Sequence, residues 1–202
     1  MPMNDLEKRI VQLSFDHQLS HISSCLNCVN LLDFIYEQRK QGDPVVLDNS
    51  HAALALYVVL EKHGLCDAGE MVERHGTHAG RDPANGIWVS GGSLGQPSTV
   101  AVGLALADKN RKVWMVTSDG SCMEGATMEA LRIGDKCCRA NLETFVVFNG
   151  FGAYGQIHDH ELPRFSNVRT YYVDQKRYPE WLRGLDGHYL KLSKSQYEEL
   201  MK

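Results

Sequence analysis

The sequence predicts an α/β fold in which a mostly parallel sheet carries helices on both faces. The apolar runs 113–117 and 144–148 read as strands, and the segment 124–139 between them reads as a helix. A strand, a helix and a strand within about 35 residues form a βαβ unit, which implies a parallel, buried sheet. The composition agrees, because 43% hydrophobic and 23% charged residues in a chain of 202 are ordinary for one globular domain.

The segment before this unit reads as helices with one short strand. Leu6, Ile10 and Leu13 recur at helical spacing, and Gly42 and Pro44 end the second helical pattern. The predicted elements are, in order, helices 4–19 and 24–40, a buried strand 45–47, a helix from the capping residue Ser50 to about His63, and a helix 67–75.

The long segment 76–97 is rich in Gly, Pro, Asn and Ser, and a loop of this length is usually functional. A helix of small residues is expected at 99–108. Beyond the βαβ unit we expect a strand at 170–173, a helical turn at 180–183 and a last helix. That helix begins with Ser193 and Gln196 at the spacing of a capping box.

Charge and hydropathy exclude several classes of function. The net charge of −4 offers no basic excess for nucleic acid or an anionic membrane. The longest apolar run, 52–60, has nine residues, whereas a membrane span needs about 20. The first nine residues are polar and mixed in charge, unlike a signal peptide. We therefore expect a cytoplasmic protein that binds neither nucleic acid nor membranes.

The six cysteines are expected to be reduced thiols in that compartment. Cys25 and Cys28 have zinc-ligand spacing, but no second pair of ligands accompanies them. They also share a helical face with Val29 and Leu32, which favours packing in the core over metal binding.

Asp119 and Asn149 each follow a predicted strand. Ligands of parallel α/β sheets bind at the carboxyl ends of the strands. A carboxylate and an amide oxygen suit Mg²⁺, and the neighbouring glycines let the backbone approach a ligand closely. On this pair alone, the alternative of two polar residues that end strands stays open.

The spacing around this pair carries a resemblance to a known family. The segment Ser118-Asp-Gly-Ser-Cys-Met-Glu-Gly125, followed by Asn149, is similar to the thiamine diphosphate motif of the transketolase family. Five further segments resemble segments of that family: Ser20-His21, Val46–His51, His75–His78, Gly91–Gln96 and Asp186–His188.

The resemblance implies a role for each matching residue. Asp119, Asn149 and the backbone carbonyl of Phe151 would bind Mg²⁺ or another divalent ion such as Ca²⁺. Thiamine diphosphate would contact Gly92, Leu94, Gly120 and His51. The implied catalytic residues include His21 and His78, which would bind sugar hydroxyls and move protons. They also include His51, which would touch the diphosphate or the substrate, and Glu124, in an acidic network at a subunit interface.

The chain departs from the family's pattern in two ways. Ser118 replaces the first Gly of the cofactor motif, and Phe148 replaces the first Asn of the later pair. Residues 1–202 also match only the family's diphosphate-binding (PP) domain, without its pyrimidine and C-terminal domains. The resemblance therefore implies a single PP domain and a second subunit that carries the other two, in an α2β2 assembly.

The expected activity is that of a transferase. A two-carbon ketol unit would pass from a ketose or ketose phosphate to an aldose acceptor, and thiamine diphosphate would carry the unit. Two alternatives remain open. The chain could serve a 2-oxo acid decarboxylase or a deoxyxylulose phosphate synthase-like enzyme, or it could be a diverged, non-catalytic module.

Overall fold

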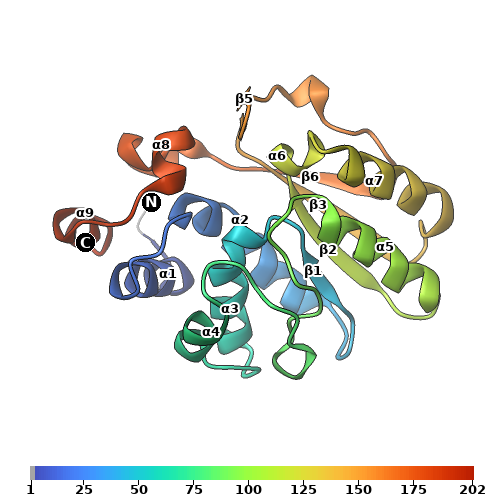
Figure 1. The fold of residues 1–202 in the computed structure, drawn as a ribbon, viewed down its shortest axis with the longest axis horizontal. Coiled ribbons are helices and arrows are strands. Elements are labelled where there is room, and N and C mark those ends of the chain that lie inside the picture. The colour runs from blue at the N-terminus through green and yellow to red at the C-terminus, as the bar shows by residue number, and fades with distance from the viewer. Residues whose placement is uncertain (1–2) are drawn as a thin grey trace.

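The computed structural model describes residues 3–202, and a parallel four-stranded sheet lies at its centre (Figure 1). The strands lie in the order β1 (Val45–Leu47), β2 (Val113–Ser118), β3 (Leu142–Phe148) and β6 (Val168–Tyr172). All three neighbouring pairs are parallel. The predicted α/β fold and its βαβ unit are confirmed, and both predicted strands extend slightly beyond the expected bounds.

Helices cover both faces of this sheet (Figure 1). The helices α5 (Gln96–Ala107) and α7 (Gly125–Cys137) pack on one face, and α1 (Asp5–Asp16), α2 (Ile22–Gln38) and α3 (Ala53–Lys62) lie on the other, with α4 (Ala68–His75) beside α3. The hydrophobic core has two parts, one on each face of the sheet, because successive side chains of a strand point to opposite faces. Trp114 and Val116 pack with the N-terminal helices, while Val113 and Met115 pack with α5 and α7. Both faces are therefore apolar, and the strand reads as a continuous apolar run.

The C-terminal segment returns to the N-terminal helices. The helix α8 (Gly184–Tyr189) contacts α2, and α9 (Lys194–Leu200) contacts α1, where the rings of Phe15 and Tyr197 stack with centroids 4.5 Å apart. The predicted capping box of α9 is present, because Ser193 and Gln196 bond each other's backbone N–H.

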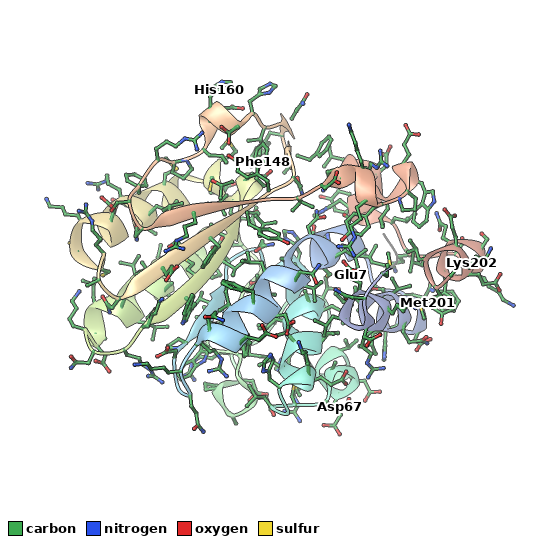
Figure 2. All side chains as sticks on the ribbon, turned by 180° about the vertical axis from the view of Figure 1, so that it is seen from behind. Glu7, Asp67, Phe148, His160, Met201 and Lys202 are labelled. Atoms are coloured by element: carbon green, nitrogen blue, oxygen red, sulfur yellow. The ribbon has the colours of Figure 1, made fainter. Side chains whose placement is uncertain are left out.

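A buried carboxylate also joins the two ends of the chain. Glu7 lies in the interior between α1 and the C-terminal segment (Figure 2) and is fully buried. Its carboxylate accepts hydrogen bonds from Arg177 at 2.6 Å and from the hydroxyl of Tyr178 at 3.3 Å. This pairing satisfies a charge that would be costly to bury alone.

The predicted cap at Ser50 is wrong. The hydroxyl of Ser50 donates instead to the carbonyl oxygen of Leu47 at 3.0 Å, and residues Ser50–Ala52 form a short 3-10 helix before α3 begins at Ala53. A serine at a strand end can bond the preceding carbonyl rather than the following N–H groups, and then it does not cap a helix.

The expected packing of Cys25 and Cys28 in the core is confirmed. Cys25 and Cys28 are buried in the core with the apolar residues of α2, and all six cysteines are free thiols. His160 lies at the outer edge of the molecule (Figure 2). No helix within residues 3–202 combines the length and the apolar character needed to cross a bilayer.

Candidate active site

A cavity of about 210 Å³ lies at the carboxyl ends of β2 and β3 and beside the first turn of α2. This is where ligands of parallel α/β sheets bind. Its walls combine polar and apolar groups. The lining residues that matter below are His21, Ser24, His51, His78, Leu94, Asp119, Gly120, Asn149, Phe151, His188 and Tyr189.

Asp119 holds the ends of the two central strands together. It begins the short helix α6 (Asp119–Cys122), which the hydroxyl of Ser118 caps. One carboxylate oxygen accepts from the N–H of Gly120 at 2.9 Å, and the other accepts from the N–H groups of Asn149 and Gly150 at 2.9 and 2.7 Å. The carboxylate is therefore fixed at the base of the cavity.

The environment of Asp119 is suited to a cation. The residue is only 1% exposed. Burial raises the pKa of its carboxyl group, and the groups that oppose this rise are backbone N–H donors rather than a charged side chain. A buried carboxylate without a cationic partner is an unfavourable arrangement that a bound metal ion would relieve.

The neighbouring oxygen atoms are also suitable ligands for a hard cation. The side-chain oxygen of Asn149 accepts the N–H of Phe151 at 2.8 Å and keeps a second lone pair. A Cβ atom built on Gly120 would lie 3.9 Å from the carbonyl oxygen of Phe151, so this oxygen faces the same turn. Carboxylate, amide and carbonyl oxygens are the ligands of Mg²⁺ and Ca²⁺. Residues 3–202 hold no group of three or more His, Cys, Asp or Glu placed for a metal, so any ion here depends on the amide and carbonyl oxygens.

Asp48 anchors the glycine-rich loop that carries Leu94 into the cavity wall. Its fully buried carboxylate accepts from the N–H groups of Gly95 and Ser98, both at 3.0 Å, and from the hydroxyl of Thr117 at 3.1 Å. These bonds join the end of β1, the start of α5 and the end of β2. The loop also lies close to the chain after β1, because a Cβ on Gly91 would meet the Ser50 side chain at 1.5 Å.

Four histidines from distant segments meet in the cavity. The ring of His21, at the start of α2, lies 5.1 Å from that of His51 and 6.2 Å from that of His78, measured between centroids. His188, from α8, lies 4.3 Å from His21 and 5.0 Å from His51. The predicted histidines are thus brought together, with a fourth that was not expected.

Burial keeps part of this cluster uncharged. Burial, reinforced by the neighbouring imidazoles, lowers the pKa of His51 to about 3 and that of His21 to about 4. Burial also lowers the pKa of His188. At neutral pH these rings are neutral, so each has one nitrogen that donates and one that accepts.

Two of the predicted site residues stand apart from the cavity. Gly92 is exposed and does not line it. Glu124 is half-buried at the start of α7 and does not line it either. The other eight predicted residues line one cavity, and the roles of all ten stay predictions.

The sequence reasoning did not assign roles to His188 and Asp48. His188 lies in the Asp186–His188 segment, which resembles a family segment, but its neighbour His21 is 167 residues away along the chain. Asp48 precedes His51 in a second such segment. The motifs pointed to the segments that hold these two residues. The contact of His188 with His21 and that of Asp48 with the glycine-rich loop are seen only in the folded structure.

Several of the known proteins that the chain resembles are named transketolases. The chain is 28% identical over 162 residues to one subunit of the apulose-4-phosphate transketolase of Phocaeicola vulgatus, across 69% of this chain and 56% of that protein. It is 28% identical over 113 residues to a transketolase of Rhodobacter capsulatus, across 46% of this chain and 17% of that one. The chain is similar to transketolases.

The fold supports the same comparison. A transketolase from Leishmania mexicana superposes with a TM-score of 0.56 at 22% identity, covering 74% of this chain and 26% of that one. No family model matches the chain. The chain therefore spans about half of the Phocaeicola vulgatus protein that it matches and a smaller part of the full transketolase chains.

Proposed function

We propose that residues 1–202 form the diphosphate-binding domain of a split, thiamine diphosphate-dependent transketolase. The observation that carries the proposal is the cavity itself, in which a buried carboxylate, an amide oxygen and several neutral imidazoles face one another at the carboxyl ends of β2 and β3. The similarity to transketolases gives this arrangement its interpretation.

In this proposal the cavity floor holds the metal and the diphosphate. Asp119, Asn149 and the carbonyl of Phe151 bind Mg²⁺, and the backbone of Gly120 contacts the diphosphate. Gly92 and Leu94 contact the rest of the cofactor through their backbone groups. Thiamine diphosphate, when bound, supplies the nucleophilic carbon that breaks and forms carbon–carbon bonds.

In this proposal the histidines bind the substrate and exchange protons with it. His21 and His78 bind hydroxyl groups of a ketose or ketose phosphate, and His51 touches the diphosphate or the substrate. Because His21 and His51 are neutral, a ring nitrogen of each can accept a proton from a hydroxyl or donate one to a forming alkoxide. Glu124 contributes to an acidic network at the interface with the partner.

A second protein chain completes the site in this proposal. The matched relative from Phocaeicola vulgatus is named as one subunit of its enzyme, which implies that the enzyme has at least one other. The cavity of about 210 Å³ is smaller than the roughly 300–1,000 Å³ of pockets that enclose ligands of this size. Tyr154 and Tyr189 are 85% and 64% exposed, so their aromatic rings are accessible to a partner chain. We expect the partner to carry the pyrimidine and C-terminal domains and to assemble as α2β2.

The test is purification of the tagged chain from its native host, followed by assay of the purified complex. We expect a partner in near-equal amount, thiamine diphosphate and Mg²⁺ in the complex, and transfer of a two-carbon unit from a ketose phosphate to an aldose. Consumption of pyruvate instead would favour the decarboxylase or deoxyxylulose phosphate synthase-like alternative. A chain recovered without partner or cofactor would contradict the proposal.

Substitution of Asp119 tests the metal site within that complex. Asp119→Ala removes the charged ligand, and we expect it to abolish Mg²⁺-dependent binding of thiamine diphosphate in titration calorimetry. Asp33→Ala is the matched control, because Asp33 pairs with Lys62 on the surface and does not line the cavity. Unchanged affinity in Asp119→Ala would show that the metal lies elsewhere.

A further inference from the structure

Three side chains form a continuous hydrogen-bonded chain along the cavity wall. Nδ1 of His21 lies 2.9 Å from Nε2 of His188, and Nδ1 of His188 lies 3.0 Å from the hydroxyl oxygen of Ser24. All three residues line the cavity. Nε2 of His21, the nitrogen left over, makes no hydrogen bond to any residue of the described range 3–202.

His188 also holds the backbone of His21. The N–H of His21 donates to the carbonyl oxygen of His188 at 2.8 Å. This contact fixes His21 at φ +66°, in the left-handed region that residues other than glycine rarely adopt. Such strained positions persist only when the surrounding structure holds them. The helix α8 therefore fixes both the backbone and the ring of His21.

Only one proton fits between the two rings, which couples their tautomers. If Nδ1–H of His21 donates to His188, then Nδ1–H of His188 donates to Ser24, and Nε2 of His21 is an acceptor. If the hydroxyl of Ser24 donates to His188, then Nε2–H of His188 donates to His21, and Nε2 of His21 carries the proton. Each ring bears one proton in both states.

We propose that His188 and Ser24 are positioning residues that set the tautomer of His21. They thereby decide whether Nε2 of His21 accepts or donates a proton in the cavity. In passing from the first state to the second, Nε2 of His21 gains a proton and Nδ1 passes its proton to His188. His188 passes its own to the oxygen of Ser24, whose hydroxyl proton returns to the cavity.

This arrangement would let one residue serve both halves of a transfer reaction. An acceptor is needed when a substrate hydroxyl loses its proton, and a donor is needed when the new hydroxyl forms. That use of the relay rests on the proposed function, whereas the relay itself belongs to this chain alone.

The experiment measures the tautomers directly. The full 202-residue chain, without partner or cofactor, is labelled with ¹⁵N-imidazole histidine, and long-range ¹H–¹⁵N spectra at neutral pH give the protonation of each ring nitrogen. We expect Ser24→Ala and His188→Asn each to change the tautomer ratio of His21 about threefold or more, as the loss of one hydrogen bond implies. Ser24→Thr, which keeps the hydroxyl, should restore the wild-type ratio.

The same spectra contain their own controls. His63 and His75, which pair with Asp33 and Asp82 outside the cavity, report on the fold in every variant. His158→Asn is the matched substitution, because His158 is exposed. An unchanged ratio in Ser24→Ala and in His188→Asn overturns the proposal. So does a change at His21 that is matched at His63 and His75, because it reflects general loosening.

The outcome is independent of the enzyme assay. The relay can be absent in a chain that supports ketol transfer with its partner, and it can be present in one that does not. The failure of this inference and the failure of the proposed function are therefore distinguished.

Discussion

The imidazole of His51 shows how a single residue depends on its surroundings. It lies among the rings of His21 and His188, and burial together with these neighbours lowers its pKa to about 3. In the unfolded chain the same ring titrates near 6.5. Folding therefore disfavours the protonated form, and this preference links the cavity to the stability of the whole chain.

The direction in which His51 makes the free energy of unfolding depend on pH can be predicted. Between pH 6.5 and about 3 the unfolded chain binds more protons than the folded one at His51, so acidification through this range lowers the free energy of unfolding. We expect His51→Gln to remove part of this loss. Between pH 7 and pH 4.5, the free energy of unfolding of the variant should rise by about 1 kcal/mol relative to that of the wild type, allowing for partial solvent screening.

Urea unfolding at a series of pH values measures this difference. His160→Gln serves as the control, since His160 is exposed, and it should follow the wild-type pH dependence. Parallel pH profiles for His51→Gln and wild type would mean that the ring titrates normally in the folded chain.

At this scale the sequence predicted the residues with local motifs and missed those defined by contacts. Asp119, Asn149, His21, His51 and His78 were expected from short segments, and the structure brings all of them to one cavity. The pairing of His188 with His21 depends on how α8 packs against α2, and no local pattern encodes that contact.

Among the elements, the end of β1 and the start of α5 are held together by one buried side chain. The carboxylate of Asp48 satisfies two N–H groups at the start of α5, which have no partner within the helix itself. Negative charge at a helix N-terminus is also favourable. The position of the glycine-rich loop against the sheet thus depends on one buried side chain.

Removing that side chain should be costly. Asp48→Ala leaves two buried N–H groups and the hydroxyl of Thr117 without their acceptor, so we expect a loss of about 3 kcal/mol in the free energy of unfolding. Thr99→Ala, an exposed position on the same helix, should change it by less than about 0.5 kcal/mol. Denaturant unfolding compares the two, and equal losses would contradict the role given to Asp48.

The elements themselves were largely predictable, with instructive exceptions. The strands followed from continuous apolar runs, and α9 followed from its capping box. The start of α3 was misplaced because the hydroxyl of Ser50 bonds a strand carbonyl instead of a helix N–H. The short helix α6 was missed because four residues are too few for a periodic pattern.

Over the whole molecule, the C-terminal segment packs on the N-terminal helices, with Leu192 and Leu200 buried in the core. Tyr197 stacks on Phe15 and bonds Gln12, while Arg177 pairs with Glu7. The segment includes α8, and with it His188. Terminal segments commonly open locally at a lower free energy than the core.

The contact of Tyr197 with Phe15 should therefore control this opening. We expect Tyr197→Ala to increase amide hydrogen exchange across 184–200 by about tenfold, as a loss of roughly 1.4 kcal/mol in local stability implies, and to leave β2 and β3 protected. Tyr154→Ala, at an 85% exposed site, is the control and should leave exchange in that segment unchanged. Equal exchange in both variants would show that other contacts hold the segment.

The order of the strands has a consequence for synthesis on the ribosome. Val45 of β1 pairs with Trp114 of β2, so the apolar faces of α2 and α3 are complete long before the sheet that covers them. At about 5–20 residues per second, roughly 3–13 s separate the synthesis of β1 from that of β2. During this interval the apolar faces of α2 and α3 lack the sheet that covers them, and we expect chaperones to shield them.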